Sequence, residues 1–552
     1  MSQLIRQSHA STGVPLWKSE SAISGGSFTA EFPDIWAGSP PTTIDDAVNR
    51  LSMILYARTS GSGTLNEPSQ QSTILVETNG FAGDSFLVKY SQDGIPIWKA
   101  RLGGILAETI NSVATDPLGN IYITGQYPGN FTIFNSDGTT FGTVDFLGFQ
   151  NNCFVIKYNA NGFAQWSARN SGVNATSIGY FIGTDSSGNV YVSSNHFNNP
   201  LTIFNSDGTT FTTLTRIGGG NNTILIKYNT NGMVQWLSRI NDSGDNGAGS
   251  VVSVMPSGEV YITGVYSGSP LTILNSDGTT FGTLANSGSF DYYLVKYNTS
   301  GFGQWSTRVA GTGAEGGFPS IKVGATGNVY ITGTYASSPL TIFNSDTTTF
   351  GTLANSGSDD IFVVKYNTSG FGQWATRIAG TSQEGAERKG ITIDASENVY
   401  LTSGFASFLL TLFNADGSTF RTIQNTGNAD GILVKYNTDG VGQWATHQAG
   451  GGNGVSYSVA VDSMGNVYQY LYLAFLSILY NADGTIFQLV SSEGGTTDNV
   501  LIKYNVNGMI QWFARQTGAG NEFPRGVATH STDVVVAGSY ASVPFFIRSA
   551  GL

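Results

Sequence analysis

The segment Phe362–Arg377, "FVVKYNTSGFGQWATR", contains the two strands that decide the fold of this chain. "FVVKY" (Phe362–Tyr366) is rich in large apolar and aromatic residues, which favour β-strands. "NTSG" (Asn367–Gly370) supplies the Asn and Gly that a tight turn needs where φ is positive. "GQWATR" (Gly372–Arg377) then returns as a second strand. The segment therefore predicts a β-hairpin.

The same order of Lys-Tyr, turn and Trp occurs seven times in the 552 residues. The tryptophans are Trp98, Trp166, Trp236, Trp305, Trp374, Trp444 and Trp512. Successive tryptophans are 68, 70, 69, 69, 70 and 68 residues apart. A period this regular indicates one structural unit repeated along the chain.

Each repeat contains further strands. They are a short one such as "SIKV" (Ser320–Val323) and, after an Asp-x-x-Gly-Asn turn, a strong one such as "VYITGTY" (Val329–Tyr335). Four strands per unit, repeated radially, predict a β-propeller with seven blades. An insert such as "LTILNSDGTTFGTL" (Leu271–Leu284) separates the second strand from the third. Because it is apolar on both sides of a polar centre, it predicts an extra β-hairpin per blade.

The two ends of the propeller sequence complement each other. After Trp512 the chain supplies two strands, "GVATH" (Gly526–His530) and "DVVVAGSY" (Asp533–Tyr540). Near the start, "STILVETNGFAGDSFLVKY" (Ser72–Tyr90) supplies half an insert and a third strand. Together they predict one composite blade that closes the ring and removes its open edges. We therefore expect an all-β fold in which residues 71–552 form a seven-bladed propeller of about 69-residue repeats.

These motifs resemble the bacterial-type seven-bladed propeller repeats called SBBP repeats. The resemblance lies in "DSSGNVYVSS" from Asp185, "GATGNVYITG" from Gly324 and "DDIFVVKYNTSGFGQW" from Asp359. It covers about residues 72–548 and implies the fold. It implies no activity, because the family is chiefly a scaffold without a shared catalytic set.

Residues 1–70 lie outside the repeats and form a predicted N-terminal extension. Within it, "TIDDAVNRLSMILYART" begins at Thr43 with a helix-capping pattern, which predicts a helix over about residues 43–58. One face of this helix carries Ile44, Ala47, Leu51, Ile54 and Leu55. The helix either packs on the propeller or is an anchor to a larger assembly. The segment resembles short stretches in structural proteins of large DNA viruses and some phages.

Composition excludes some classes of protein. The formal net charge is −12, with 25 Lys and Arg against 37 Asp and Glu, so nucleic acid is not an expected partner. The single cysteine, Cys153, excludes an intrachain disulfide. The longest apolar run, Tyr470–Tyr480, is too short to span a membrane, and we expect it to be a buried strand or an apolar contact surface. The start of the sequence lacks a classical signal peptide, so we expect a virion or extracellular surface, or alternatively the cytoplasm.

The sequence offers few residues with catalytic or ligand-binding patterns. None of the four histidines has a His or Cys neighbour at metal-ligand spacing, so no catalytic residue, metal or cofactor is predicted. His447 replaces the arginine of the other repeats, and Cys153 is expected to be buried. The recurring "NSDGTTFGT" (Asn135–Thr143) offers one Asp per copy, which favours an Asp-Gly turn over a calcium loop. Repeated Lys and Arg in the third and fourth strands are expected to have structural roles.

Acidic residues in the loops between blades are the remaining candidates. They are Glu108, Asp242, Asp245, Glu315, Glu384, Glu387 and Glu522. We expect a solvated loop surface, with a cation-binding or acid–base ring at the axis as the alternative. The most charged loop, "QEGAERKG" (Gln383–Gly390), is a candidate binding loop through Glu384, Glu387, Arg388 and Lys389.

Three classes of function agree with this sequence. The first is a non-enzymatic structural or surface-display protein, of a virion or a cell surface, attached to protein partners through residues 1–70. The second is an adhesin that binds a glycan or a protein with the insert-bearing face. The third is a hydrolase or lyase with a site at the axis.

Overall fold

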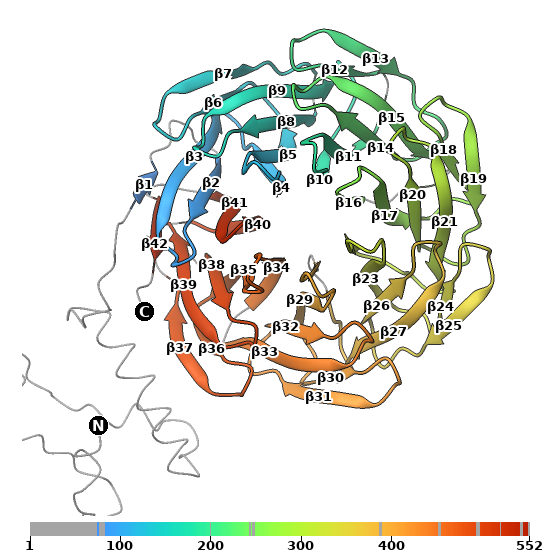
Figure 1. The fold of residues 1–552 in the computed structure, drawn as a ribbon, viewed down its shortest axis with the longest axis vertical. Helices are drawn as coiled ribbons and strands as arrows, with labels where there is room; N and C mark the ends of the chain where they lie inside the picture. The colour runs from blue at the N-terminus through green and yellow to red at the C-terminus, as the bar shows by residue number, and fades with distance from the viewer. Residues whose placement is uncertain are drawn as a thin grey trace, which may run out of the picture. The chain divides into compact units, whose positions relative to one another are not determined.

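The computed structural model describes residues 74–76, 83–148, 150–198, 200–241, 244, 249–385, 389–450, 454–492, 497–518, 520–540 and 545–549. All of them fall within the unit Asn66–Leu552. They form 42 β-strands arranged as seven radial six-stranded antiparallel sheets, and these described ranges contain no helix (Figure 1). The predicted seven-bladed propeller is therefore confirmed. The predicted helix over about residues 43–58, with Ile44, Ala47, Leu51, Ile54 and Leu55, lies outside the described residues.

The four strands of each repeat run from the axis outward, and we number the blades 1 to 7 in the order of the lists that follow. The innermost strands are β40 (Glu522–His530), β4 (Thr109–Thr115), β10 (Gly179–Thr184), β16 (Val251–Val254), β22 (Ser320–Val323), β28 (Gly390–Ile393) and β34 (Gly454–Val461). The second strands are β41 (Asp533–Tyr540), β5 (Ile121–Tyr127), β11 (Val190–His196), β17 (Val260–Tyr266), β23 (Val329–Tyr335), β29 (Val399–Phe405) and β35 (Val467–Ala474). The third strands are β2 (Ser85–Tyr90), β8 (Asn152–Tyr158), β14 (Asn222–Tyr228), β20 (Asp291–Tyr297), β26 (Asp360–Tyr366), β32 (Asp430–Tyr436) and β38 (Thr497–Tyr504). The fourth strands are β3 (Pro96–Gly104), β9 (Ala164–Ser171), β15 (Val234–Asn241), β21 (Gly303–Ala310), β27 (Gly372–Ala379), β33 (Gly442–Gly450) and β39 (Ile510–Thr517).

Two further strands cover the outer edge of each blade. The fifth strands are β6 (Phe131–Phe134), β12 (Leu201–Phe204), β18 (Leu271–Leu274), β24 (Leu340–Phe343), β30 (Leu409–Phe413), β36 (Leu476–Tyr480) and β42 (Phe545–Ser549). The sixth strands are β7 (Thr140–Val144), β13 (Thr210–Leu214), β19 (Thr280–Leu284), β25 (Thr349–Leu353), β31 (Thr419–Gln424), β37 (Ile486–Ser491) and β1 (Ile74–Val76).

The outer hairpin of each blade comes from the following repeat. Strand β18 follows β17 of blade 4 along the chain, yet it pairs with β15 of blade 3 through Ile240–Ile273 and Asn241–Thr272. The same exchange occurs at every blade, so each repeat completes the sheet before it. The sequence predicted the hairpin but not the blade to which it is added.

The chain ends close the ring as predicted. Strand β2 pairs with β41 along six residue pairs from Ser85–Ser539 to Tyr90–Val534, which forms the composite blade 1. Strand β1 pairs with β42, as in Ile74–Ile547, which forms the outer hairpin of blade 7 from both ends of the propeller (Figure 1).

The core consists of apolar layers between neighbouring blades. Alternate residues of the third strand enter different layers, since successive side chains of a strand point to opposite faces. In β26, Phe362 and Val364 pack toward blade 4, whereas Ile361 and Val363 pack toward blade 6. Strand β35 is buried along all eight residues, which confirms a buried strand for that part of the apolar run. No helix of the described residues is long and apolar enough to cross a membrane.

Candidate functional site

The turn of the outer hairpin is held by its own side chains. Asp277 Oδ1 accepts hydrogen bonds from the backbone N (2.9 Å) and the hydroxyl (2.6 Å) of Thr279. Asn275 Oδ1 accepts one from the backbone N of Gly303 at 2.9 Å, and Gly278 has a φ of 83°. The Asp277 oxygen holds the turn and the Asn275 oxygen joins it to β21 of blade 4, so the predicted Asp-Gly hairpin is confirmed.

The repeated Trp joins each blade to the next, and in five blades the repeated Lys does so as well. Lys227 Nζ and Trp236 Nε1, both of blade 3, donate to the backbone oxygen of Thr299 in blade 4 at 3.2 and 3.0 Å. Lys227 Nζ also lies 5.1 Å from the ring centroid of Tyr191. The role is structural, as predicted, and these contacts connect neighbouring blades. Lys89 and Lys296 instead form ion pairs within their own blades, with Asp533 at 3.0 Å and Glu259 at 2.8 Å.

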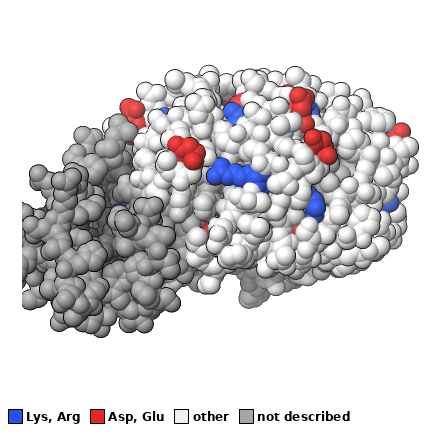
Figure 2. Space-filling model, turned by 90° about the horizontal axis from the view of Figure 1, so that it is seen from below, with Lys and Arg blue, Asp and Glu red and all other residues white. Residues whose placement is uncertain are grey.

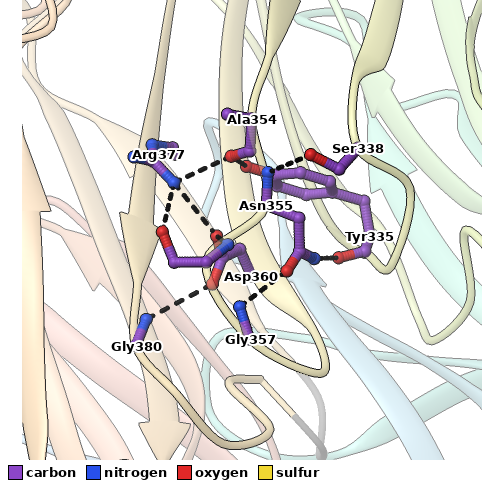
Figure 3. Close-up of polar contacts among 9 residues, drawn as sticks. Tyr335, Ser338, Ala354, Asn355, Gly357, Asp360, Arg377 and Gly380 are labelled. Carbon is purple, nitrogen blue, oxygen red and sulfur yellow. Dashed lines mark hydrogen bonds and ion pairs between the residues drawn. The ribbon is translucent and has the colours of Figure 1, made fainter.

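A buried Asp–Arg pair fixes the loop before the third strand (Figure 3). In blade 5, Asp360 Oδ2 accepts from the backbone N of Ser356 at 2.8 Å and from Arg377 Nη1 at 3.3 Å. Arg377 Nη1 also donates to the backbone oxygen of Ala354 at 2.8 Å. The other carboxylate oxygen of Asp360 accepts from the backbone N of Gly380 at 3.3 Å. One carboxylate thereby joins the outer hairpin, the third strand and the loop to the next blade.

A glutamate follows this aspartate by 24 residues in four blades. The pairs are Asp84 with Glu108, Asp291 with Glu315, Asp360 with Glu384, and Asp498 with Glu522. All four glutamates are 0% exposed, so the expectation of a solvated loop surface is wrong for them. We call each pair a carboxyl joint. Asp242, Asp245 and Glu387 lie outside the described residues.

Glycine makes the space for these glutamates. Each lies four residues after a glycine, and a Cβ atom at Gly104 or Gly380 would collide with a carboxylate oxygen of Glu108 or Glu384. Neither oxygen of these two glutamates has a hydrogen-bond partner of normal geometry. The side chain turns inward because the glycine leaves a cavity of carboxylate size beneath the loop.

Burial controls the protonation of the carboxyl joints. Burial first, and then the charge of the neighbouring aspartate, raise the pKa of Glu108 and of Glu522 to about 8. Burial and Asp360 raise the pKa of Glu384 to about 7. Two carboxylates without solvent repel each other, so one of them holds a proton near neutral pH.

The sequence of the other blades agrees with this interpretation. Where asparagine replaces the aspartate, at Asn152 and Asn222, the position 24 residues later is not acidic. Blade 6 has Asp430 with Gly454, and there His447 replaces the arginine. Its ring stacks on Tyr480 at 4.4 Å, and burial lowers its pKa to about 4.

The candidate binding loop, Gln383–Gly390, is partly internal. Glu384 is buried in a carboxyl joint, and Lys389 is 3% exposed with its Nζ 2.8 Å from the backbone oxygen of Gly385. Glu387 and Arg388 lie outside the described residues. Cys153 is buried as predicted, and burial raises the pKa of its thiol to about 12.

Sequence reasoning missed the open grooves along the outer rim of the ring. The groove between blades 2 and 3 has a volume of about 910 Å³ and is lined by Phe211, Trp236, Arg239, Asp277 and Phe302 among others. The groove between blades 4 and 5 has a volume of about 490 Å³ and is lined by the equivalent Phe350, Trp374, Arg377 and Asp416. We call these spaces rim grooves. A signal was present, since a phenylalanine follows the Asn-x-Asp turn in every outer hairpin from β6–β7 to β36–β37.

Seven radial sheets joined by swapped hairpins and buried polar contacts define a β-propeller scaffold. Residues 97–126 match the SBBP β-propeller repeat family, so the predicted repeat type is confirmed. The chain is 26% identical over 434 residues to "Uncharacterized WD repeat-containing protein L264" of Acanthamoeba polyphaga mimivirus. That alignment covers 69% of this chain and 30% of the viral protein, so the chain spans less than a third of that relative.

Solved structures with similarity to the chain include two lyases. The exotype rhamnogalacturonan lyase YesX is 10% identical with a TM-score of 0.30, and the comparison covers 77% of this chain and 88% of YesX. A streptogramin B lyase is 8% identical with a TM-score of 0.28, covering 83% of this chain and 98% of the enzyme. At these scores the similarity carries no argument about function.

Proposed function

We propose that this chain is a non-enzymatic structural or surface-display propeller, a component of a virion or cell surface that attaches to protein partners. The observation that carries the proposal is the swapped outer hairpin, which joins every blade to its neighbour and presents the same exposed turn around the rim. Such a ring suits a rigid platform with repeated contact sites. The similarity to a protein of a mimivirus supports a viral origin for such a scaffold.

The burial of the glutamates weighs against the axial enzyme. An acid–base pair must reach its substrate, and Glu108, Glu315, Glu384 and Glu522 are closed inside carboxyl joints. The platform function needs no such access.

Residues 1–70 would be the attachment segment of this platform. The test compares the full chain with a variant that lacks residues 1–70, both tagged at the C-terminus, by immunogold labelling of intact particles or cells. Labelling of the full chain and its loss in the truncated, folded variant is the expected result. Equal labelling of both would refute the attachment role of the segment, and labelling of neither would refute surface display.

The exposed aromatic side chains on the rim favour a glycan-binding adhesin as the second candidate. Phe141 and Phe211 of the outer hairpins are 39% and 40% exposed, and Phe163 and Phe302 of the neighbouring turns are 38% exposed. Flat exposed aromatic rings are platforms on which ligand rings can pack. A glycan array with the purified full chain tests this function separately from particle attachment.

A further inference from the structure

We infer that the rim grooves are repeated subsites for a neutral polysaccharide, with one sugar unit packed against the aromatic residues of a groove. The inference rests on the second candidate function and assigns it to particular residues. It concerns the rim and not the axis, although Arg377 of the groove between blades 4 and 5 also donates to Asp360 of a carboxyl joint at 3.3 Å.

The walls of the groove between blades 2 and 3 supply the aromatic surface. Phe211 on β13 and Phe302 in a turn of blade 4 line the same groove and are 40% and 38% exposed. A sugar ring presents apolar C–H groups on one face, and packing this face on a phenyl ring removes apolar area from water. The groove therefore offers one phenyl ring on each side, Phe211 and Phe302, against which a sugar ring can pack.

The Asp-Gly turn supplies the polar contact. Asp277 lines the groove and uses Oδ1 for its bonds to Thr279. These hydrogen bonds from Thr279 lower the pKa of Asp277, so the exposed carboxylate is ionised at neutral pH. An ionised carboxylate is an acceptor for sugar hydroxyls. The basic residues of this groove already donate to backbone oxygens, Lys227 to Thr299 and Arg239 to Thr215.

This distribution of charge favours a neutral ligand. The equivalent acids of the rim are Asp137, Asp207, Asp277, Asp346, Asp416 and Asp483. Each is ionised and exposed, so the rim repels acidic polymers. On the side of the ring seen in Figure 2, charged side chains are few and separated by uncharged surface, which suits hydroxyl-rich ligands.

The junction of blades 5 and 6 shows how the chain fills such a groove. Arg421 on β31 reaches from blade 5 to blade 6, where Nη1 donates to the backbone oxygens of Ala445 at 2.6 Å and Ala482 at 2.9 Å. At the equivalent position the other outer strands carry Gly142, Thr212, Gly282, Gly351 and Gln488.

The three glycines are not required by the fold. A Cβ atom at Gly142, Gly282 or Gly351 would meet no atom within 4 Å, and none of the three has a positive φ. Glycine inside a strand weakens it and often marks a place where a ligand approaches closely. The absence of a side chain at these three glycines is therefore consistent with grooves that receive a ligand.

Repetition favours a polymer over a folded protein as the occupant. A polysaccharide presents one chemical unit at regular intervals, and the ring presents at least two related grooves, between blades 2 and 3 and between blades 4 and 5. Several weak contacts to one polymer add up to strong binding through effective concentration. A folded protein partner would match one groove or two.

The test uses the purified full chain on an array of neutral oligosaccharides built from glucose, galactose, mannose and N-acetylglucosamine, printed beside sialylated and uronate-containing ones. A fourfold variant fills the open grooves with the side chain that Arg421 provides. Its substitutions are Gly142→Arg, Thr212→Arg, Gly282→Arg and Gly351→Arg. The control adds four arginines to exposed loop positions at the opposite end of the third strands. These are Gly219→Arg, Ser289→Arg, Ser358→Arg and Asn428→Arg.

We expect binding to a neutral oligosaccharide, a loss of at least about tenfold in the groove-filled variant, and full binding in the control. The milder pair Phe211→Ala and Phe302→Ala should lower binding without affecting folding, because both rings are partly exposed. Binding only to acidic glycans, no binding, or equal binding by all variants overturns the inference. Immunogold labelling of particles or cells with the groove-filled variant tests the proposed surface display separately from glycan binding. That labelling depends on residues 1–70 and not on the rim grooves, so it should be retained.

Discussion

Thr347 occupies a backbone position that glycine occupies in the other five outer turns. Its φ is 71°, in the left-handed region that a β-branched residue rarely adopts, whereas Gly278 in the equivalent turn has 83°. The surrounding hairpin is intact, with Asp346 bound to Thr348 as in the other copies. The hairpin therefore holds Thr347 against its own conformational preference.

Replacing Thr347 by glycine should stabilise the protein. Removing the strain of about 1–3 kcal/mol outweighs the backbone entropy of glycine, so we expect a gain of about 1 kcal/mol in the free energy of unfolding. Urea titration followed by tryptophan fluorescence measures the change. The reverse substitution, Gly278→Thr, should destabilise by a similar amount, and a neutral result for both would contradict the strain.

The carboxyl joints should make stability fall as the pH rises. The pKa of Glu108 and of Glu522 is about 8 in the folded protein, against 4.5 when exposed. Between these values the folded state binds more protons than the unfolded state, so the free energy of unfolding decreases as pH increases. We expect the contribution of the protonated glutamates to the free energy of unfolding to be complete below about pH 4.5 and to be lost by about pH 8.

Glutamine at these positions removes the titration. Glu108→Gln and Glu522→Gln should each raise the free energy of unfolding at pH 8.5, relative to the parent, on the order of 1–3 kcal/mol. At pH 5.5 the difference should be much smaller, because the glutamate is then protonated. Urea unfolding at both pH values measures it. Glu259→Gln, at a partly exposed ion pair with Lys296 (2.8 Å), is the control without a pH-dependent gain.

The sequence contained the positions of these glutamates but not their burial. Loops rich in Gly, Asn and Ser usually lie in solvent, which is why a solvated surface was predicted. Two spacings carried the information, the glycine four residues before each glutamate and the aspartate 24 residues before it. Their meaning depends on contacts between strands and loops far apart in the chain, which a single repeat does not reveal.

The outer hairpin shows the same limit at the scale of an element. Its alternating apolar residues predict two strands, and β18 and β19 form there. The fourth strands of blades 3 and 4 have the same pattern, so the sequence cannot tell which of them receives β18. The short path from the second strand to the preceding blade decides it in three dimensions.

A double-mutant cycle distinguishes attachment of β18 to blade 3 from attachment of β18 to blade 4. Ile273 is 0% exposed and pairs with Ile240 of blade 3, so Ile273→Ala should cost about 2–4 kcal/mol. Combined with Ile240→Val it should show a coupling energy above about 0.5 kcal/mol, measured by urea unfolding. Combined with Leu294→Ala in blade 4, which packs in another core layer, it should be additive. Thr272→Ala, on the half-exposed face of β18, controls for changes in strand propensity.

The number of blades and the place of closure were predictable at the scale of the whole molecule. Seven tryptophans gave the count, and the unpaired strand sequences at the two ends gave the composite blade. The rim grooves were not predictable, because they are spaces between outer hairpins of different blades. Closure also has an energetic consequence, since blade 1 and the outer edge of blade 7 each depend on both ends of the propeller.

Truncation from the C-terminus should therefore act in two steps. Removing residues 541–552 deletes β42 and the buried Phe545 and Ile547, but it leaves blade 1 complete. We expect a lower Tm with the β-sheet circular dichroism retained. Removing residues 518–552 also deletes β40 and β41, which exposes the edge of β2 and its buried Phe86 and Val88. That chain should lose its cooperative thermal transition.

Complementation provides the control for the truncation. A peptide of residues 518–552 supplies β40, β41 and β42 in trans. If the truncated chain is destabilised because it lacks these strands, the peptide should bind the chain of residues 1–517. Calorimetry should then show a cooperative transition near the parent Tm. A truncated chain that already melts cooperatively at the parent Tm would show that six blades and an open edge suffice, and that the joined ends contribute little to stability.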